Sequence, residues 1–158
     1  MLNDNVKTAA EILGRLANNE KIQSIIAELQ KELLNSPEQF VWKTLNEHLT
    51  PQELDSEFKS AWMFVLRKNT PSEAHYHPNS IQYTAVIEGV GTFELDGIKS
   101  SLQKFDPSIP ETLYVINKGA PHEFFPGNKD LVVLSLHTAA EDELIEINCS
   151  ENKERKYE

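Results

Sequence analysis

The stretch NTPSEAHYHPNSIQYTAVIEGVGTFELDG, residues 69–97, carries the strongest structural and chemical signals of the chain. His75 and His77 are separated by one residue. Side chains on a β-strand alternate between its two faces, so both imidazoles are predicted to point the same way. Two further strands are predicted over residues 83–88 and 92–95, which are rich in β-branched and aromatic residues. Consecutive strands joined by short turns form a meander, and this arrangement is suited to placing two nitrogen ligands inside a small barrel.

The flanking sequence predicts more short strands, separated by glycine and proline turns. These strands cover residues 40–45, 60–68, 98–103, 113–116, 122–125, 130–137 and 144–148. Residues 62–66 are consecutively apolar, so their strand is expected to be buried on both faces. Residues 40–45 are also compatible with a short helix. The series of short strands is typical of an antiparallel sandwich or a jelly-roll barrel.

Residues 5–34 are predicted to be helical, because apolar residues recur there at helical spacing. Asn18 and Asn19 can break the helix, and the proline after Ser36 ends it. A helix-turn-helix that reads DNA is one alternative, but the segment carries little excess basic charge. The simpler interpretation is a helical hairpin that packs on the barrel or on a partner subunit.

Three segments are therefore expected along the 158 residues. Residues 1–36 form the helical segment, residues 37–148 form the β-barrel, and residues 149–158 form a charged tail that is expected to fray. The length suits one domain with a real hydrophobic core.

The net charge of −10 argues against nucleic acid and anionic membrane as partners. No apolar run approaches the length that crosses a bilayer, and no secretory signal is visible at the N-terminus. Cys149 is the only cysteine, so an intrachain disulfide is impossible. A cytoplasmic location is the simplest expectation from this cysteine usage.

The opening stretch also resembles the first motif of the cupin superfamily. That motif consists of a glycine, five residues, His-x-His, three or four residues, a glutamate, six residues and a glycine. His75, His77 and Gly89 match it, Asn69 stands at the first glycine, and Gln82 stands where glutamate is usual. Asparagine is among the residues other than glycine that best tolerate a positive φ.

The family's second motif centres on a histidine three residues after a glycine, and Gly119 and His122 fit that core. The rest of the motif departs from the family, since glycine, proline and asparagine are replaced by Glu111, Asn117 and Pro126. The resemblance covers residues 60–138. It implies a mainly β chain with a cupin-type double-stranded β-helix, that is, a jelly-roll barrel, preceded by the N-terminal helical hairpin.

The resemblance further implies a metal site at His75, His77, Gln82 and His122, which would hold one divalent transition metal: Fe, Ni, Mn or Zn. Three histidines on one side of a metal leave positions open for water, oxygen or substrate. Glutamine offers only a neutral amide oxygen, so Gln82 is either a weak ligand or a hydrogen-bonding group beside the metal. The alternatives are ordinary polar histidines on a strand, and a metal-free cupin marked by Gln82.

Two more residues are candidates for the substrate pocket. Phe124 lies two residues beyond His122 and shares its predicted strand face, and His137 ends another predicted strand. Both are also compatible with a role in the core or at its rim. No arginine clamp for a substrate is evident, because Arg67 is the only arginine near the first motif.

Three classes of function follow from the resemblance. The favoured one is a metal-dependent enzyme with dioxygenase-type chemistry that acts on a small, anionic molecule. The others are an isomerase or lyase, in which the metal acts as a Lewis acid, and a non-catalytic cupin that binds a small molecule. A homodimer is expected, because the edges of an open jelly roll need cover and the helical segment is unusually apolar.

Overall fold

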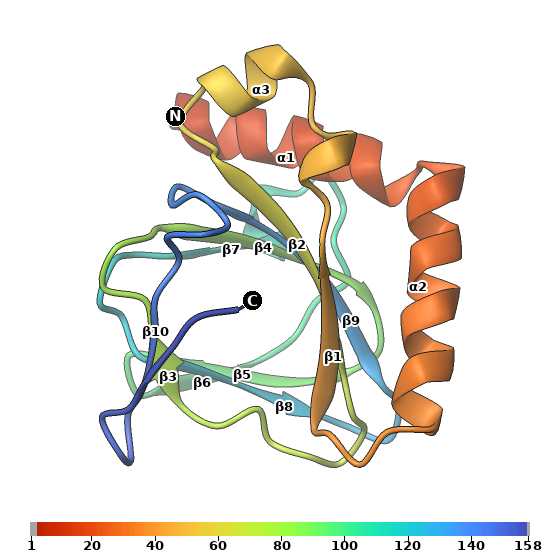
Figure 1. Ribbon diagram of the computed structural model, residues 1–158, viewed down its shortest axis with the longest axis vertical. Helices are drawn as coiled ribbons and strands as arrows, with labels where there is room; N and C mark the ends of the chain where they lie inside the picture. The colour runs from red at the N-terminus through yellow and green to blue at the C-terminus, as the bar shows by residue number, and fades with distance from the viewer. Residues whose placement is uncertain (1–2, 158) are drawn as a thin grey trace.

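A computed structural model of the chain describes residues 3–157 and consists of two antiparallel β-sheets that form a barrel (Figure 1). The first sheet contains, in spatial order, β1 (Phe40–Thr44), β2 (Ser60–Leu66), β9 (Leu131–His137), β4 (Gln82–Glu88) and β7 (Leu113–Ile116). The second sheet contains β11 (Glu154–Arg155), β10 (Glu146–Asn148), β3 (His75–Tyr76), β8 (His122–Pro126), β5 (Gly91–Leu95) and β6 (Ile98–Ser101). The predicted jelly-roll barrel is confirmed, and residues 40–45 supply a strand rather than a helix.

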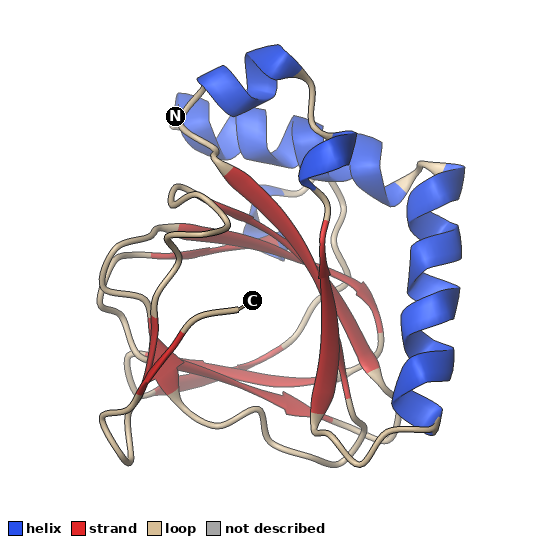
Figure 2. Ribbon diagram, viewed as in Figure 1, coloured by secondary structure: helices blue, strands red, loops and turns tan. Residues whose placement is uncertain are grey.

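The helices lie outside the barrel, along two adjoining sides of it (Figure 2). They are α1 (Asp4–Ala17), α2 (Glu20–Leu34) and the short α3 (Pro51–Asp55), with 3-10 turns η1 (Asn46–His48) and η2 (Pro110–Thr112). The side chains of Asn3 and Asn19 cap α1 and α2 by accepting from backbone N–H groups at 2.8 Å. Figure 1 shows that α1 lies across one end of the barrel and α2 runs down its side. Within residues 3–157, no helix is long and apolar enough to cross a membrane.

The central strands β2, β9 and β4 of the first sheet are buried on both faces, as predicted for residues 62–66. The outer face of this sheet packs against the apolar stripes of α1 and α2 in one cluster, which includes Leu13, Ile26, Met63, Ala85 and Leu134. Its inner face points into the barrel. The stripe of the helices is therefore covered by the chain's own sheet. The homodimer stays a prediction. The apolar helices no longer support it, and the remaining ground is the edge strand β1, which could pair with a second copy.

Up to residue 157 the tail is structured and contains the strand β11, which corrects the expectation of a frayed tail. β11 pairs antiparallel with β10, so that Arg155 lies opposite Glu146 and Glu154 lies opposite Ile147. Figure 1 shows the chain end folded back over the centre of the barrel. The composition of the tail is misleading because one aromatic side chain anchors it and one of its charged residues, Arg155, pairs with the buried Glu146.

That anchor is Tyr157, which packs edge-on against three aromatic rings of the first sheet. Its ring centroid lies 5.3 Å from that of Trp42, 5.7 Å from Trp62 and 5.5 Å from Phe64. Edge-to-face contacts at these distances stabilise aromatic clusters beyond the area that they bury. The tail is thus joined to both sheets, through β10 and through this cluster.

We expect Tyr157→Ala to lower the free energy of unfolding by roughly 2–4 kcal/mol, because it removes a large aromatic side chain from a packed cluster. Urea denaturation checks this value. Tyr157→Phe keeps the ring and should cost much less, and Lys156→Ala is the matched control at an exposed neighbour. Equal stability of Tyr157→Ala and the wild type would show that the tail is not anchored in solution.

Candidate metal centre in the barrel

The pairing of β3 with β8 brings the predicted histidines together. His75 lies directly opposite His122 across the two strands, and His77 comes immediately after the end of β3. The potential ligand atoms of His75, His77 and His122 all lie within 4.8 Å of one another. The structure therefore groups three of the four residues predicted as metal ligands into one cluster.

Glycines of the two motifs make this arrangement possible. Gly119 has φ +77° in the turn before β8, and its N–H donates to the carbonyl of His77 at 2.9 Å. Gly89 has φ +100°, and a Cβ there would lie 2.6 Å from the carbonyl oxygen of Asp130. Asn69 has φ 55°, so asparagine adopts the positive φ expected at the first position of the motif.

Each of the three rings is oriented by a hydrogen bond at its Nδ1 atom. The partners are the backbone carbonyl oxygens of Glu73, Ala120 and Ile145, at 3.0, 2.9 and 2.8 Å from His75, His122 and His77. A carbonyl oxygen only accepts, so each Nδ1 carries the proton and donates it. In the neutral ring, the Nε2 lone pair is then free to bind a metal. Such bonds are the usual way in which proteins orient metal-binding histidines.

Burial keeps these rings neutral. Desolvation, together with the neighbouring His77 ring, lowers the pKa of His75 to about 3. Desolvation likewise lowers the pKa of His77, and it lowers the pKa of His122 well below the ordinary value. A metal binds the neutral imidazole, so these pKa values favour metal binding at neutral pH.

The clearest sign of a missing partner is the Nε2 atom of His122. This atom is buried and has no hydrogen-bond partner within residues 3–157. An unsatisfied buried polar atom costs about 1–3 kcal/mol, so its presence calls for an explanation. A first-row metal at about 2.1 Å from the ring nitrogens would satisfy it. The donor set of three neutral imidazoles fits such an ion.

Gln82 lies in the wall of the same cavity, which His75 and His77 also line. Its amide nitrogen donates to the hydroxyl of Thr84 at 2.7 Å and contacts that of Ser135 at 3.4 Å. Its amide oxygen is buried and has no hydrogen-bond partner among the described residues. The oxygen is thus available to a metal, a water or a substrate, and the choice between ligand and neighbouring group stays a prediction.

Both predicted pocket residues also line this cavity. The Nδ1 atom of His137 lies 2.8 Å from the hydroxyl of Ser80, and its ring centroid is 5.0 Å from that of His77. Phe124 stacks on Phe93 with centroids 4.8 Å apart and belongs to an apolar cluster of the barrel interior. Phe124 is thus part of the core and of the cavity wall at once.

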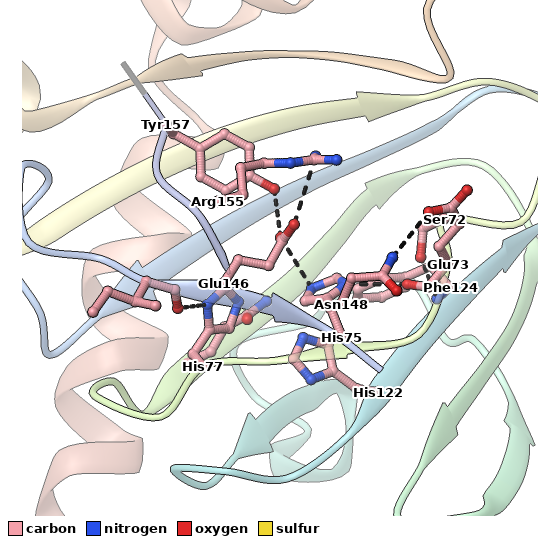
Figure 3. A network of polar contacts seen from close by, with 12 residues as sticks. Ser72, Glu73, His75, His77, His122, Phe124, Glu146, Asn148, Arg155 and Tyr157 are labelled. Atoms are coloured by element: carbon pink, nitrogen blue, oxygen red, sulfur yellow. Dashed lines mark hydrogen bonds and ion pairs between the residues drawn. The ribbon is translucent and has the colours of Figure 1, made fainter. Parts of the chain in front are cut away.

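Among the cavity residues that sequence reasoning missed, Glu146, Arg155 and Tyr157 form a connected polar group. Figure 3 shows Glu146 between His75 on one side and the two tail residues on the other. One carboxylate oxygen lies 3.5 Å from His75 Nε2 and accepts from the Tyr157 hydroxyl, and the other lies 3.5 Å from the Arg155 guanidinium. Arg67, in contrast, donates to the backbone carbonyls of Leu33, in the last turn of α2, and of Ser36, just after it. The sequence offered one signal for these contacts: Tyr157 is an aromatic residue within an otherwise charged tail, which suggests a buried anchor.

Comparisons with known proteins agree with this architecture. No protein-family model matches the sequence, and no curated protein matches it closely. Among solved structures, the chain is similar to oxalate decarboxylase of Lactobacillus farciminis, with TM-score 0.56, 16% identity and coverage of 73% of this chain and 33% of that chain. This match rests on the cupin barrel. The chain has the cupin fold.

Other cupin-fold structures are matched at similar levels. Hazelnut vicilin gives TM-score 0.56 and 17% identity, with 72% of this chain and 32% of that chain covered. A protein described as a candidate sugar phosphate isomerase from Acidithiobacillus ferrooxidans gives TM-score 0.52 and 17% identity, with 73% and 68% covered. The chain spans about a third of the vicilin and of the decarboxylase. These identities establish the fold alone, and the fold does not select an activity.

The buried histidines make stability depend on pH. His75, His77, His122 and His137 all have lowered pKa values in the folded chain, chiefly through burial, whereas unfolded histidine titrates near 6.5. Below that pH the unfolded chain binds protons that the folded chain does not, so stability falls on acidification. Each histidine can contribute up to about 1.4 kcal/mol per pH unit.

We therefore expect the metal-free protein to lose stability from about pH 6.5 downward, toward pH 3 where His75 itself titrates. Urea denaturation in the presence of a chelator, at intervals between pH 7.5 and 5, measures the effect. His122→Ala should flatten the profile relative to the wild type. A flat profile in the wild type would contradict the burial of these rings.

Proposed function

We propose that this cupin is a metal-dependent enzyme that acts on a small anionic molecule, with dioxygenase-type chemistry. The observation that carries the proposal is the cluster of His75, His77 and His122. Hydrogen bonds at Nδ1 orient the three rings so that their Nε2 atoms lie close together, and Nε2 of His122 has no hydrogen-bond partner among the described residues. Such a cluster needs a cation, and a cavity opens beside it. A purely storage or packing role would leave these features unexplained.

The metal proposed for this site is a divalent first-row ion, and iron is the one that supports oxygen chemistry. His75, His77 and His122 would hold it, and the amide of Gln82 would orient a water or the substrate beside it. The C-terminal residues Arg155 and Tyr157 line the cavity and would limit the access of water to it. Burial and the charge of Glu146 raise the pKa of Tyr157 well above 10, so the phenol keeps its proton and acts as a donor.

An anionic substrate follows from the charges around the cavity. The three imidazoles are neutral, so they cancel none of the metal's positive charge. Arg155 also lines the cavity, where the carboxylate of Glu146 at 3.5 Å offsets its charge, so the metal itself is the main positive group. A small carboxylate or thiolate would therefore be attracted to the open side of the metal. The apolar wall around Phe124 and Val133 suits a short carbon skeleton attached to that anion.

The first test is metal binding itself. We expect the wild type to bind one divalent first-row ion per chain, and His75→Ala or His77→Ala to abolish this binding, because two remaining imidazoles hold an ion poorly. Titration with Fe²⁺, Ni²⁺, Mn²⁺ and Zn²⁺ by calorimetry, after chelator treatment, measures it. His48→Ala is the matched control, since His48 does not line the cavity. A wild type that binds none of these ions would refute the proposal.

Oxygen consumption tests the finer part of the proposal. The iron-loaded protein is screened with thiols, diketones and aromatic diols, and consumption with one of these classes is expected. His75→Ala should consume no more oxygen than a blank. Metal binding without any oxygen consumption would count against dioxygenase chemistry and in favour of Lewis-acid chemistry.

The residue at position 82 provides a further test. We expect Gln82→Glu to tighten Zn²⁺ binding, because an anionic oxygen replaces a neutral one, by roughly 10-fold or more. The same change should weaken binding of acetate and mercaptoacetate to the zinc form, because the net charge of the site falls by one unit. Gln103→Glu is the matched control on the surface. If neither affinity changes, Gln82 does not face the site, and the register assigned to the first motif is wrong.

A further inference from the structure

Glu146 is a buried carboxylate that neither cupin motif predicts, and it faces the histidine cluster from β10. Only 7% of its surface is exposed. β10 pairs with β3, with Asn148 opposite His75, so Glu146 is carried to the edge of the cluster by the backbone register itself. Its Oε1 atom lies 3.5 Å from the Nε2 atom of His75.

These two facing atoms are both acceptors. The Nδ1 atom of His75 donates to the carbonyl of Glu73, so in the neutral ring Nε2 carries a lone pair and no proton. The Oε1 atom of Glu146 accepts from the Tyr157 hydroxyl, so it also offers lone pairs toward the ring. Two acceptors 3.5 Å apart in a buried site repel each other. A cation between them would turn this repulsion into two favourable contacts.

The geometry points to Glu146 as the anionic ligand of the metal centre, in the role that glutamate has in the first cupin motif and that Gln82 cannot fill. This inference rests on the metal site proposed above. Two ligands at about 2.1 Å from one ion are separated by roughly 3.0–3.4 Å. The 3.5 Å between Glu146 Oε1 and His75 Nε2 is close to that range. Glu146 is close to His75 and is not within the 4.8 Å group that the three histidines form, so its carboxylate would turn toward His77 and His122 when an ion binds.

The C-terminal tail then becomes part of the metal site. The Tyr157 hydroxyl donates to Oε1 of Glu146, and the Arg155 guanidinium lies 3.5 Å from Oε2. Both groups hold the carboxylate with its oxygens directed along the cavity wall (Figure 3). Partners of this kind orient metal ligands, and their removal weakens metal binding. With Glu146 bound, the centre keeps one positive charge, and an anionic substrate remains favoured.

The test is the affinity of the purified full chain for Zn²⁺, measured by competition with a chromophoric chelator. We expect Glu146→Gln to weaken binding by about 100-fold or more, and Tyr157→Phe by about 10-fold, because loss of an outer partner costs less than loss of a ligand. Glu141→Gln makes the same charge change at an exposed position and should leave the affinity unchanged. The visible absorption of the Co²⁺ form should also change in Glu146→Gln, as expected for a lost ligand.

A rescue variant separates a ligand from a structural role. In the double variant Glu146→Gln with Gln82→Glu, the carboxylate returns to its motif position, and Zn²⁺ affinity should recover most of the loss. A double variant that stays as weak as Glu146→Gln, while Gln82→Glu alone tightens binding, would overturn the inference. If Glu146→Gln does not fold, Glu146→Asp replaces it, since retracting the carboxylate by one methylene must also weaken binding.

Failure of this inference is distinct from failure of the proposed function. If the wild type and Glu146→Gln bind Zn²⁺ equally well while His75→Ala does not bind, then Glu146 is no ligand but the three-histidine site stands. If the wild type itself binds no metal, both are refuted. Weak binding by Glu146→Gln, a changed Co²⁺ spectrum and rescue by Gln82→Glu together support the inference.

Discussion

The alignment of His75 with His122 across β3 and β8 is the contact on which the site depends. Side chains alternate along a strand, so a slip of one residue in this pairing would turn one imidazole out of the barrel. β3 is only two residues long, and it is held in register by β8 on one side and β10 on the other. The same register brings the carboxylate of Glu146 beside the histidines.

The two sheets differ in their packing and in the site residues that they carry. The first has long central strands that are buried on both faces and backed by α1 and α2, so it forms a well-packed wall that carries Gln82 and His137. The second has short strands and supplies the three histidines. Regions with few packed neighbours open locally at low free-energy cost. The mouth of the cavity is therefore expected to move more readily than its back wall.

Much of this arrangement could be predicted from local sequence signals. The His75–His77 spacing, the apolar run at residues 62–66 and the glycines of the two motifs each depend on near neighbours, and each predicted its element correctly. Glu146 and Tyr157 could not be predicted in this way. Their importance comes from contacts with segments far away in the chain, and no local pattern encodes which side of a short edge strand will meet the cavity.

The separation of the ligands along the chain has a consequence for folding. His75 and His77 are neighbours from the start, whereas His122 and Glu146 reach them only when β8 and β10 have paired with β3. Such long-range pairings are slow to form because loop-closure entropy opposes them. An ion held by all of these residues would bind the closed barrel far better than the open chain, so its binding energy would be folding energy. The bound metal would therefore stabilise the second sheet, whose short strands provide few hydrogen bonds and packing contacts of their own.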